Sequence, residues 1–297
     1  MSNPKLGYYG KHFSEKVSII VLTSTARHDV ENLLASIDEQ DYEHTEVFVQ
    51  HRESITTLIN RTTGKYLLFL SSGTTVHYGL INNLICRMKV FNLAALSLIP
   101  TYRASGLIGK CIYPLNDFLL LNLLPLRLVR LSGLPAFTAG SNDCLFFDAT
   151  VYKQHKWHEK LQIKVLEATE IIKLVKQQQL KAEVLLANKF VYNTVDIKDI
   201  TSFSMRLLMN FANSNLVALI YLMLVIVGPV VVSLDFNPAL AILPVGLIFL
   251  SRVMIAFLTA QNPLVQVLLH PLQMILLFGL ILKGIWGRIV VSIKLKK

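Results

Sequence analysis

The 19 acidic side chains of this 297-residue chain are unevenly spread, and no Asp or Glu occurs in the 63 residues between Glu53 and Asp117. Glu167 lies further along, directly before an apolar pattern of helical spacing. A positioned carboxylate that accepts the proton of an attacking hydroxyl contributes about 10²–10⁴-fold in rate. A carboxylate at this position can serve such chemistry, or it can be an acid that the dipole at a helix start favours.

Hydroxyl groups directly follow one of the apolar segments. Ser71 and Ser72 precede Gly73 there, and Thr74 comes next. Such a loop can bind phosphate through hydroxyl groups and backbone amides, or it can be a simple turn. Asp143, which follows a Gly-Ser-Asn sequence, is likewise either an acceptor-binding residue or a turn residue.

The overall composition indicates a membrane protein with a soluble head. Hydrophobic residues make up 53% of the chain and charged residues only 16%, against about 25% charged in ordinary soluble domains. The net charge is +10, and residues 205–297 carry seven basic residues and one acid on an apolar background. This pattern favours a membrane over nucleic acid as the partner. The three cysteines form no CxxC pair, which favours buried free thiols over a disulfide framework or a zinc site.

The segment before residue 205 follows an α/β pattern. Continuous apolar strands that alternate with helices predict a mostly parallel sheet with crossover helices, covered on both faces. We expect a polar arm over 1–15 and one α/β head over 16–205. Strands are predicted at 17–22, 46–50, 66–70, 94–99, 144–147 and 182–187, and helices at 29–40, 80–90 and 165–178.

Residues 206–297 are predicted to form an α-helical membrane domain. Each of its three apolar runs has about the 20 residues that a spanning helix needs. Basic residues at both ends of the domain favour the cytoplasm for both, which three spans do not allow, so two or three spans remain open. No signal peptide precedes the head, so we expect a protein of the cytoplasmic membrane with a cytoplasmic head. The candidate spans are 216–234, 239–260 and 264–282.

The leucine-rich segment 114–135 has two readings. It is too short and too interrupted by proline to span a bilayer. Arg127 and Arg130 beside so many leucines favour an interfacial segment at the membrane surface, and a core helix is the alternative.

Several motifs, taken in order, resemble those of family 2 glycosyltransferases, the inverting GT-A enzymes, in their membrane-anchored form with C-terminal transmembrane helices. The resemblance implies a GT-A-like nucleotide-diphospho-sugar transferase fold. It also implies transfer of a sugar from a nucleotide donor to a lipid or lipid-linked acceptor at the cytoplasmic leaflet. The similar motifs are VSIIV from Val17, LLASI from Leu33, GKYLLFL from Gly64, the helix that follows Glu167, His270-Pro271 and Trp286-Gly287-Arg288.

The same resemblance shows which catalytic positions differ in this chain. Gln50 stands where the family has an acid that contacts the base, and Ser71-Ser72-Gly73 stands where it has the metal-binding DxD motif. Ala168 replaces the Asp of its "ED" motif. We expect donor contacts from Thr23, Gln50, Ser71, Ser72 and Gly73, an acceptor contact from Asp143, and the general base at Glu167.

These replacements weaken the expected catalysis. The family uses Mg²⁺ or Mn²⁺, which are hard cations bound by oxygen ligands, and neutral serine hydroxyls hold them poorly. We therefore expect no metal and no other cofactor, and a head that is divergent or catalytically impaired. The expected partners are membrane lipid and a nucleotide-sugar, with no nucleic acid. The alternative function is a non-catalytic membrane scaffold that pairs with an active glycosyltransferase.

Overall fold

The computed structural model describes residues 4–23, 27–103, 106–160, 167–194, 200–211, 214–228, 231 and 238–295. The chain divides into two compact units, each made of two separate stretches of sequence. Unit 1 comprises Met1–Arg103 and Leu124–Val195, and unit 2 comprises Ala104–Leu123 and Asp196–Lys297. Residues 104–123, which belong to the predicted head by sequence, therefore group with the C-terminal helices.

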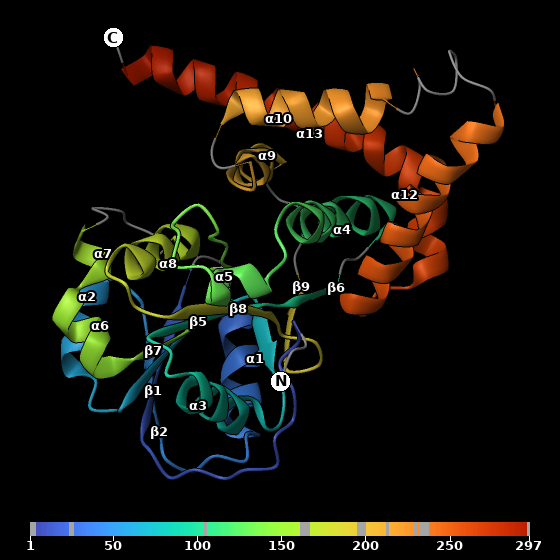
Figure 1. Cartoon of the computed structure of the whole chain (residues 1–297). Coiled ribbons are helices and arrows are strands. Elements are labelled where there is room, and N and C mark those ends of the chain that lie inside the picture. Colours follow the sequence, from blue (N-terminus) through green and yellow to red (C-terminus); the bar gives the residue numbers. More distant parts are fainter. Residues whose placement is uncertain are drawn as a thin grey trace. The chain divides into compact units, whose positions relative to one another are not determined.

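Unit 1 is built on a six-stranded sheet in the order β2-β1-β3-β7-β5-β8 (Figure 1). β1 pairs in parallel with β2 and β3, and β5 pairs in parallel with β8. The mostly parallel sheet is thus confirmed, with β7 as the antiparallel strand between β3 and β5. The strands are β1 (Val17–Leu22), β2 (Thr45–Val49), β3 (Tyr66–Ser71), β5 (Ala95–Ile99), β7 (Cys144–Asp148) and β8 (Ala182–Leu186).

The reversed strand has a topological cause. The chain leaves β5 at its carboxyl end and enters β7 at that same edge of the sheet, so β7 must run back against its neighbours. Sequence periodicity predicts that a segment is a strand but carries no information on its direction. As a result, the loop that precedes β7 lies at the carboxyl edge of β3 and β5.

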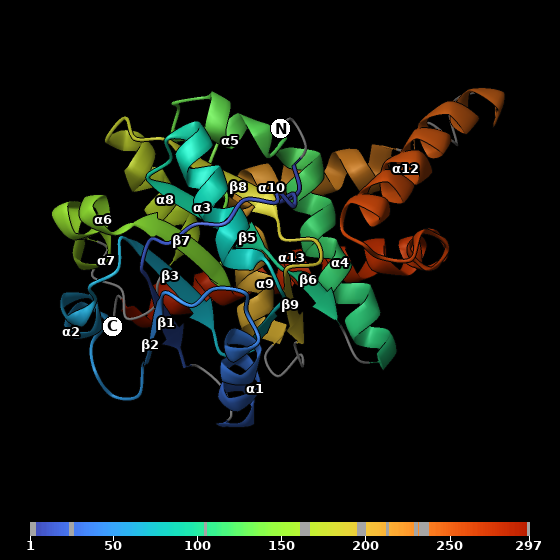
Figure 2. The same cartoon turned by 90° about the horizontal axis from the view of Figure 1, so that it is seen from below.

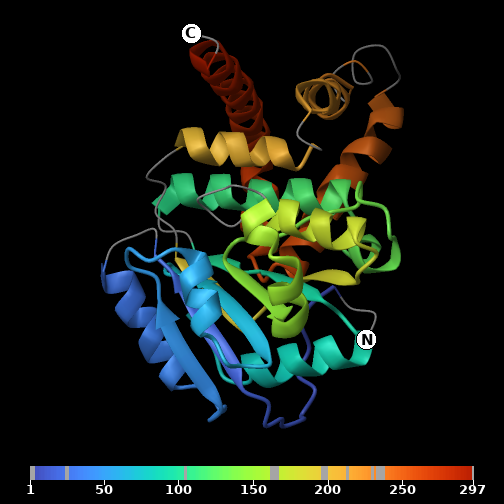
Figure 3. The same cartoon turned by 90° about the vertical axis from the view of Figure 1, so that its left-hand side faces the viewer.

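Helices cover both faces of this sheet (Figure 3). Alternate strand side chains, such as Ile19 and Leu68, pack with α1 and α3 in one apolar core. Phe69 and Phe147 point to the other face, where their rings contact Tyr152 of α6. The helices of this unit are α1 (Arg27–Asp38), α2 (Ile55–Arg61), α3 (Leu80–Phe91), α5 (Arg127–Leu131), α6 (Ala149–His155), α7 (Trp157–Lys160) and α8 (Ala168–Gln177).

Three short strands form a second sheet beyond the carboxyl edge of the first. Their order is β4-β9-β6, and β6 and β9 lie side by side in Figures 1 and 2. β4 (Thr74–Val76) continues from the end of β3, and β6 (Thr101–Arg103) continues from the end of β5. β9 (Val191–Thr194) pairs with both. Strands of three or four residues give too little pattern to be predicted from the sequence.

The N-terminal arm is packed against unit 1. The amide of Leu6 donates to the carbonyl of Leu186 at 2.9 Å, which extends the sheet along its β8 edge. Further along, the amides of Tyr9 and Phe13 donate to the side chains of Asn83 and Asn82 on α3, at 2.7 and 3.0 Å. An unpaired sheet edge is thereby covered.

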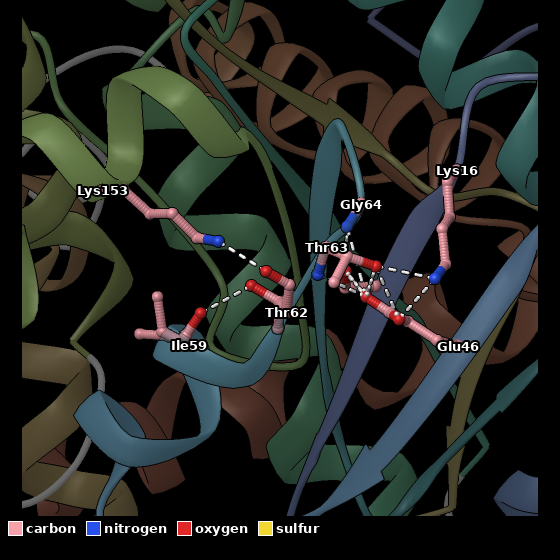
Figure 4. A network of polar contacts seen from close by, with 8 residues as sticks. Lys16, Glu46, Ile59, Thr62, Thr63, Gly64 and Lys153 are labelled. Carbon is pink, nitrogen blue, oxygen red and sulfur yellow. Dashed lines mark hydrogen bonds and ion pairs between the residues drawn. The ribbon is translucent and has the colours of Figure 1, made fainter.

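A polar network ties β2 to the starts of β1 and β3 (Figure 4). The Glu46 carboxylate pairs with Lys16 at 2.7 Å and accepts hydrogen bonds from the Ser18 hydroxyl at 2.5 Å and the Thr63 amide at 2.7 Å. Gly64 is required here, because a Cβ atom would lie 2.5 Å from the Ser18 hydroxyl. Burial acts to raise the pKa of Glu46, but Lys16, Ser18 and Thr63 outweigh it and lower the pKa to about 2.

This shift predicts a pH-dependent contribution to stability. A carboxyl group with a lowered pKa in the folded state stabilises the protein above its unfolded pKa, and the stabilisation is lost as pH falls toward 2. Because Lys16 is half-exposed, we expect Glu46→Gln to cost about 1–2 kcal/mol at pH 7 and much less at pH 3. Denaturant unfolding of the full chain measures this through Trp157 fluorescence in a Trp286→Phe background. An equal cost at both pH values would contradict it.

A buried ion cluster joins α3, α5 and β8. The Arg87 guanidinium donates two hydrogen bonds to Glu183, at 2.6 and 2.7 Å, and both side chains are almost fully buried. Nε of Arg130 lies 3.2 Å from the same carboxylate. Phe91 contacts both guanidinium groups, at 4.3 and 3.8 Å from its ring centroid. The expectation that Arg130 faces lipid headgroups is therefore wrong, because its charge is used inside unit 1, whereas Arg127 is exposed.

Loss of the Glu183 charge should destabilise unit 1 strongly. Glu183→Gln leaves two buried guanidinium groups without a counter-charge, so we expect a loss of about 3–5 kcal/mol in the free energy of unfolding. Glu53→Gln is the matched control, because Glu53 forms an exposed ion pair with Arg61 and should change stability by less than about 1 kcal/mol. Comparable effects of the two substitutions, measured by denaturant unfolding, would show that the buried cluster is not stabilising.

Unit 2 consists of helices packed around a leucine-rich core. Its core combines Leu115 and Leu119 of α4 with Leu207 and Leu208 of α9 and Leu277 of α13. The helices are α4 (Gly106–Leu123), α9 (Ile200–Met209), α10 (Asn215–Leu222) with the π-helical turn η1 (Met223–Val227), α12 (Pro238–Leu258) and α13 (Pro263–Leu295).

Within the described part of the chain, one helix is long and apolar enough to cross a membrane, judged by length and composition: Pro263–Val290 of α13. It contains the predicted span 264–282. The predicted span 239–260 corresponds to α12, in which 245–258 is the apolar part. The predicted span 216–234 begins as α10, and residues 229–230 and 232–237 lie outside the described residues.

Candidate functional site

The predicted donor-binding residues of the first two strands meet at the carboxyl edge of the main sheet. Thr23 follows β1 and Gln50 follows β2, and the Thr23 hydroxyl donates to the Gln50 carbonyl. The Gln50 amide in turn donates to Val21 at 2.9 Å. Because parallel strands end at the same edge, both residues lie beside the end of β3.

The turn after β3 presents two of its three residues outward. Ser72 is fully buried, and its amide donates to the Leu22 carbonyl at 3.0 Å. Ser71 and Gly73 are partly exposed on either side of it. The two outward positions of this turn therefore carry one hydroxyl group and no side chain.

Asp143 anchors the turns around this edge. Its carbonyl accepts the amide of Ser71 at 3.0 Å. Its Oδ2 accepts the hydroxyls of Ser141 and Tyr102, at 2.7 and 3.1 Å, and its Oδ1 accepts the Asn193 amide at 2.7 Å. Three protein donors thus occupy the carboxylate that was predicted to contact an acceptor. The geometry describes a structural role, and the acceptor contact stays a prediction.

Asn142 places Glu167 next to the hydrogen-bond network of Asp143. The side-chain oxygen of Asn142 accepts the amide of Ala168 at 2.6 Å and so caps the start of α8. Its side-chain nitrogen lies 3.4 Å from Oε2 of Glu167. Glu167 does not cap the helix itself and is half-buried. Its carboxylate is therefore held by a neighbouring amide and stays free to accept another hydrogen bond.

Ala168 is packed closely against Gly140. It is fully buried, and a Cβ atom on Gly140 would lie 2.7 Å from the Cβ of Ala168. Only glycine therefore fits at position 140, and position 168 carries a small apolar side chain with no contact to solvent.

A buried lysine forms hydrogen bonds with the loop that precedes Asp143. Nζ of Lys176, on α8, donates to the carbonyl of Phe137 at 2.5 Å and lies 3.5 Å from that of Leu134. Burial lowers the pKa of Lys176 to about 8. This contact was not predicted, because both carbonyls belong to a loop that is remote from α8 in sequence.

The polar network around the edge is larger than the predicted site. The 140–143 loop connects the predicted site residues at the carboxyl edge of the main sheet. These residues are Thr23, Gln50, Ser71, Ser72, Gly73, Asp143 and Glu167. The sequence did not predict three further members of the network, which are Tyr102, Asn193 and Asn142. Tyr102 and Asn193 lie on short strands. For Asn142, the Gly-Ser-Asn-Asp sequence indicated only a turn. Among the described residues, no group of three or more His, Cys, Asp or Glu side chains could hold a metal ion.

No protein-family model and no curated protein sequence matches the chain. Solved structures of glycosyltransferases do match it. The mannosyltransferase PcManGT from Pyrobaculum calidifontis, in complex with GDP-Man and Mn²⁺, is 14% identical, with 96% of this chain and 89% of that chain covered and a TM-score of 0.49. S. aureus TarS 1–349 in complex with UDP-GlcNAc is 12% identical, with 92% of this chain and 89% of that chain covered and a TM-score of 0.40.

The packing of Ala168 predicts that an aspartate at this position destabilises unit 1. We expect Ala168→Asp to destabilise unit 1 by about 2–5 kcal/mol, because it overpacks the Gly140 contact and buries a carboxylate. Thr169→Asp is the matched control, since position 169 is half-buried in the first helical turn, where an acid is tolerated. Denaturant unfolding followed by Trp157 fluorescence compares them. Wild-type stability of Ala168→Asp would mean that room for the acid exists.

Proposed function

We propose that this chain is a membrane-bound, family 2 glycosyltransferase-like protein that binds a nucleotide-sugar at the carboxyl edge of β1, β2 and β3. Its metal and acid–base apparatus is reduced, and Glu167 is the carboxylate on which sugar transfer depends. The observation that carries the proposal is the 140–143 loop, which joins the end of β3 to the start of α8. It brings Ser71 and Glu167, residues far apart in sequence, to one edge of the sheet.

The polarity of α13 supports the membrane part of the proposal. Leu264, Leu268 and Ile275 are 75%, 80% and 69% exposed, whereas Gln266 and Gln273 are 5% and 0% exposed. A helix on the surface of a soluble protein has the opposite arrangement. A bilayer favours apolar side chains outside and polar side chains in the interior of a helical bundle.

The acceptor proposed for this site is a lipid or lipid-linked hydroxyl, at the cytoplasmic side of the cytoplasmic membrane. Its proton would pass to the Glu167 carboxylate while the oxygen attacks the sugar and the nucleoside diphosphate leaves. No carboxylate pair is available at Ser71 and Gly73 to hold a cation for the leaving group. The amides of Ser71 and Ser72 already donate to Asp143 and Leu22. The groups proposed to bind the diphosphate there are therefore the Gly73 amide and the Ser71 hydroxyl.

The second candidate is a non-catalytic scaffold that retains nucleotide-sugar or lipid and pairs with an active glycosyltransferase. One observation favours it: Ala168, which aligns with the family's general base, is fully buried and carries no carboxylate. The scaffold differs from the enzyme in a single measurable respect, which is dependence on Glu167.

Nucleotide binding and sugar transfer test the proposal together. Titration calorimetry of the purified full chain with UDP and GDP should show binding that added Mn²⁺ does not strengthen, because no acidic motif follows β3. Transfer from radiolabelled UDP- and GDP-sugars to membrane lipids should fall about 10²–10⁴-fold in Glu167→Gln. Glu170→Gln is the control, since Glu170 lies one turn further along α8 in an exposed pair with Lys173.

Each outcome separates the alternatives. Binding that is retained in Glu167→Gln together with lost transfer supports the enzyme. Binding without transfer in the wild type supports the scaffold. Tight binding that requires Mn²⁺ would overturn the metal-free site, and failure to bind any nucleoside diphosphate would overturn the nucleotide-sugar assignment.

A further inference from the structure

The interior of unit 2 contains a guanidinium group with too few partners. Arg252, on α12, is 1% exposed, and its Nη2 donates to the side-chain oxygen of Gln273 on α13. Its charge also lies over the ring of Phe118, 4.4 Å from the centroid. Nε of Arg252 is buried without a hydrogen-bond partner. One neutral amide is thus the hydrogen-bond partner that the described residues provide for a buried positive charge.

The nearest acid does not neutralise this charge by contact. Asp117, on α4, interacts with Arg252 electrostatically but forms no ion pair with it among the described residues. Its Oδ2 accepts a hydrogen bond from Gln261 at 3.2 Å, and its Oδ1 is buried without a partner. Asp117 itself is 2% exposed.

His270 completes the set of unpartnered groups. It is 7% exposed, and its Nδ1 is buried without a hydrogen-bond partner. Its ring meets Phe118 and Phe249 edge-on, at centroid distances of 5.8 and 5.9 Å. Phe118 therefore contacts both Arg252 and His270, which places the two side chains around one ring.

The orientation of the guanidinium is held in advance. Gln273 donates through its side-chain nitrogen to Gln266 at 2.8 Å, so its oxygen must face Arg252. Gln273 is fully buried and Gln266 is 5% exposed. Gln273 therefore accounts for one hydrogen bond of Arg252, and among the described residues the Nε–H group has none.

Physical reasoning identifies what the partner must be. A buried charge is costly unless it is paired, and buried polar atoms without partners indicate a group that the protein chain does not supply. A metal cation is repelled by Arg252. A neutral water molecule satisfies hydrogen bonds but leaves the charge uncompensated. An oxyanion satisfies both requirements, and arginine binds phosphate and carboxylate oxygens in a defined geometry.

We propose that Arg252, with His270 beside it and Gln273 to orient it, binds an oxyanion of the phosphate type in the interior of unit 2. The phosphate is either free in solution or part of a lipid headgroup. Exposed apolar side chains on the same helix, such as Leu250 and Met254, are compatible with arrival from a bilayer. The proposal concerns unit 2 alone and does not depend on sugar transfer by unit 1.

Thermal unfolding of the full chain in a zwitterionic detergent tests the free-phosphate source. Sodium phosphate should raise the unfolding midpoint above that in sodium chloride of equal ionic strength. Arg252→Gln should weaken the apparent phosphate affinity about 10- to 100-fold, since it removes charge-assisted hydrogen bonds. Arg127→Gln, at an exposed arginine, is the matched control and should leave the phosphate response unchanged. Arg252→Lys, which keeps the charge, should retain part of the response if Arg252→Gln fails to fold.

A lipid source is tested with the same variants in nanodiscs. Phosphatidic acid added to phosphatidylcholine should stabilise the wild type, and native mass spectrometry should find a phospholipid that Arg252→Gln does not retain. Stabilisation by phosphatidic acid without a response to free phosphate identifies the lipid headgroup. The reverse result identifies free phosphate.

Asp117→Asn separates an oxyanion site from an internal ion pair. If Arg252 binds an oxyanion, removal of the neighbouring carboxylate charge should tighten phosphate binding, because less negative charge competes for the guanidinium. If Asp117 and Arg252 neutralise each other through internal water, Asp117→Asn should destabilise the protein as much as Arg252→Gln does. That result, with no response to phosphate or phosphatidic acid in the wild type, would overturn the proposal.

Discussion

The close approach of the Gly140 backbone to the first turn of α8 constrains most of the candidate site. Because Gly140 has no side chain, α8 can start against the loop that precedes β7. Asn142 then caps the helix. Asp143 forms hydrogen bonds with the end of β3 and with the short strands β6 and β9. A larger residue at position 140 would push α8 away and separate Glu167 from Ser71. The arrangement of the site therefore depends on one contact between backbone and Ala168.

Buried charges are treated differently in the two units. In unit 1, Glu183 receives two hydrogen bonds from Arg87 and an ion pair from Arg130, so its desolvation is offset by contacts within the chain. In the described part of unit 2, Arg252 has one amide partner, and Asp117 forms no ion pair with it. The first arrangement is a structural cluster that is complete in itself. The second lacks a partner, which is the basis of the proposed oxyanion site.

Much of the architecture could be predicted from local pattern. The six strands of the main sheet and the helices α1, α3 and α8 were predicted from apolar runs and helical spacing, because burial on two faces dictates those patterns. The direction of β7 could not be predicted in this way, since strand direction depends on where the chain re-enters the sheet. Nor could the role of Arg130, because a sequence that alternates leucine and arginine fits a membrane surface as well as a buried ion pair.

The sequence by itself determined the α/β head, the apolar C-terminal helices and the absence of carboxylates at positions 71, 73 and 168. These are properties of residue type and local spacing, which need no knowledge of distant contacts. Tertiary structure alone decided that Asp143 is held by three donors and that Ala168 is fully buried against Gly140. It also decided that Arg252 and Asp117 are both buried but form no ion pair among the described residues. Each of these depends on segments far apart in the chain, and their approach is set by packing and not by any local pattern.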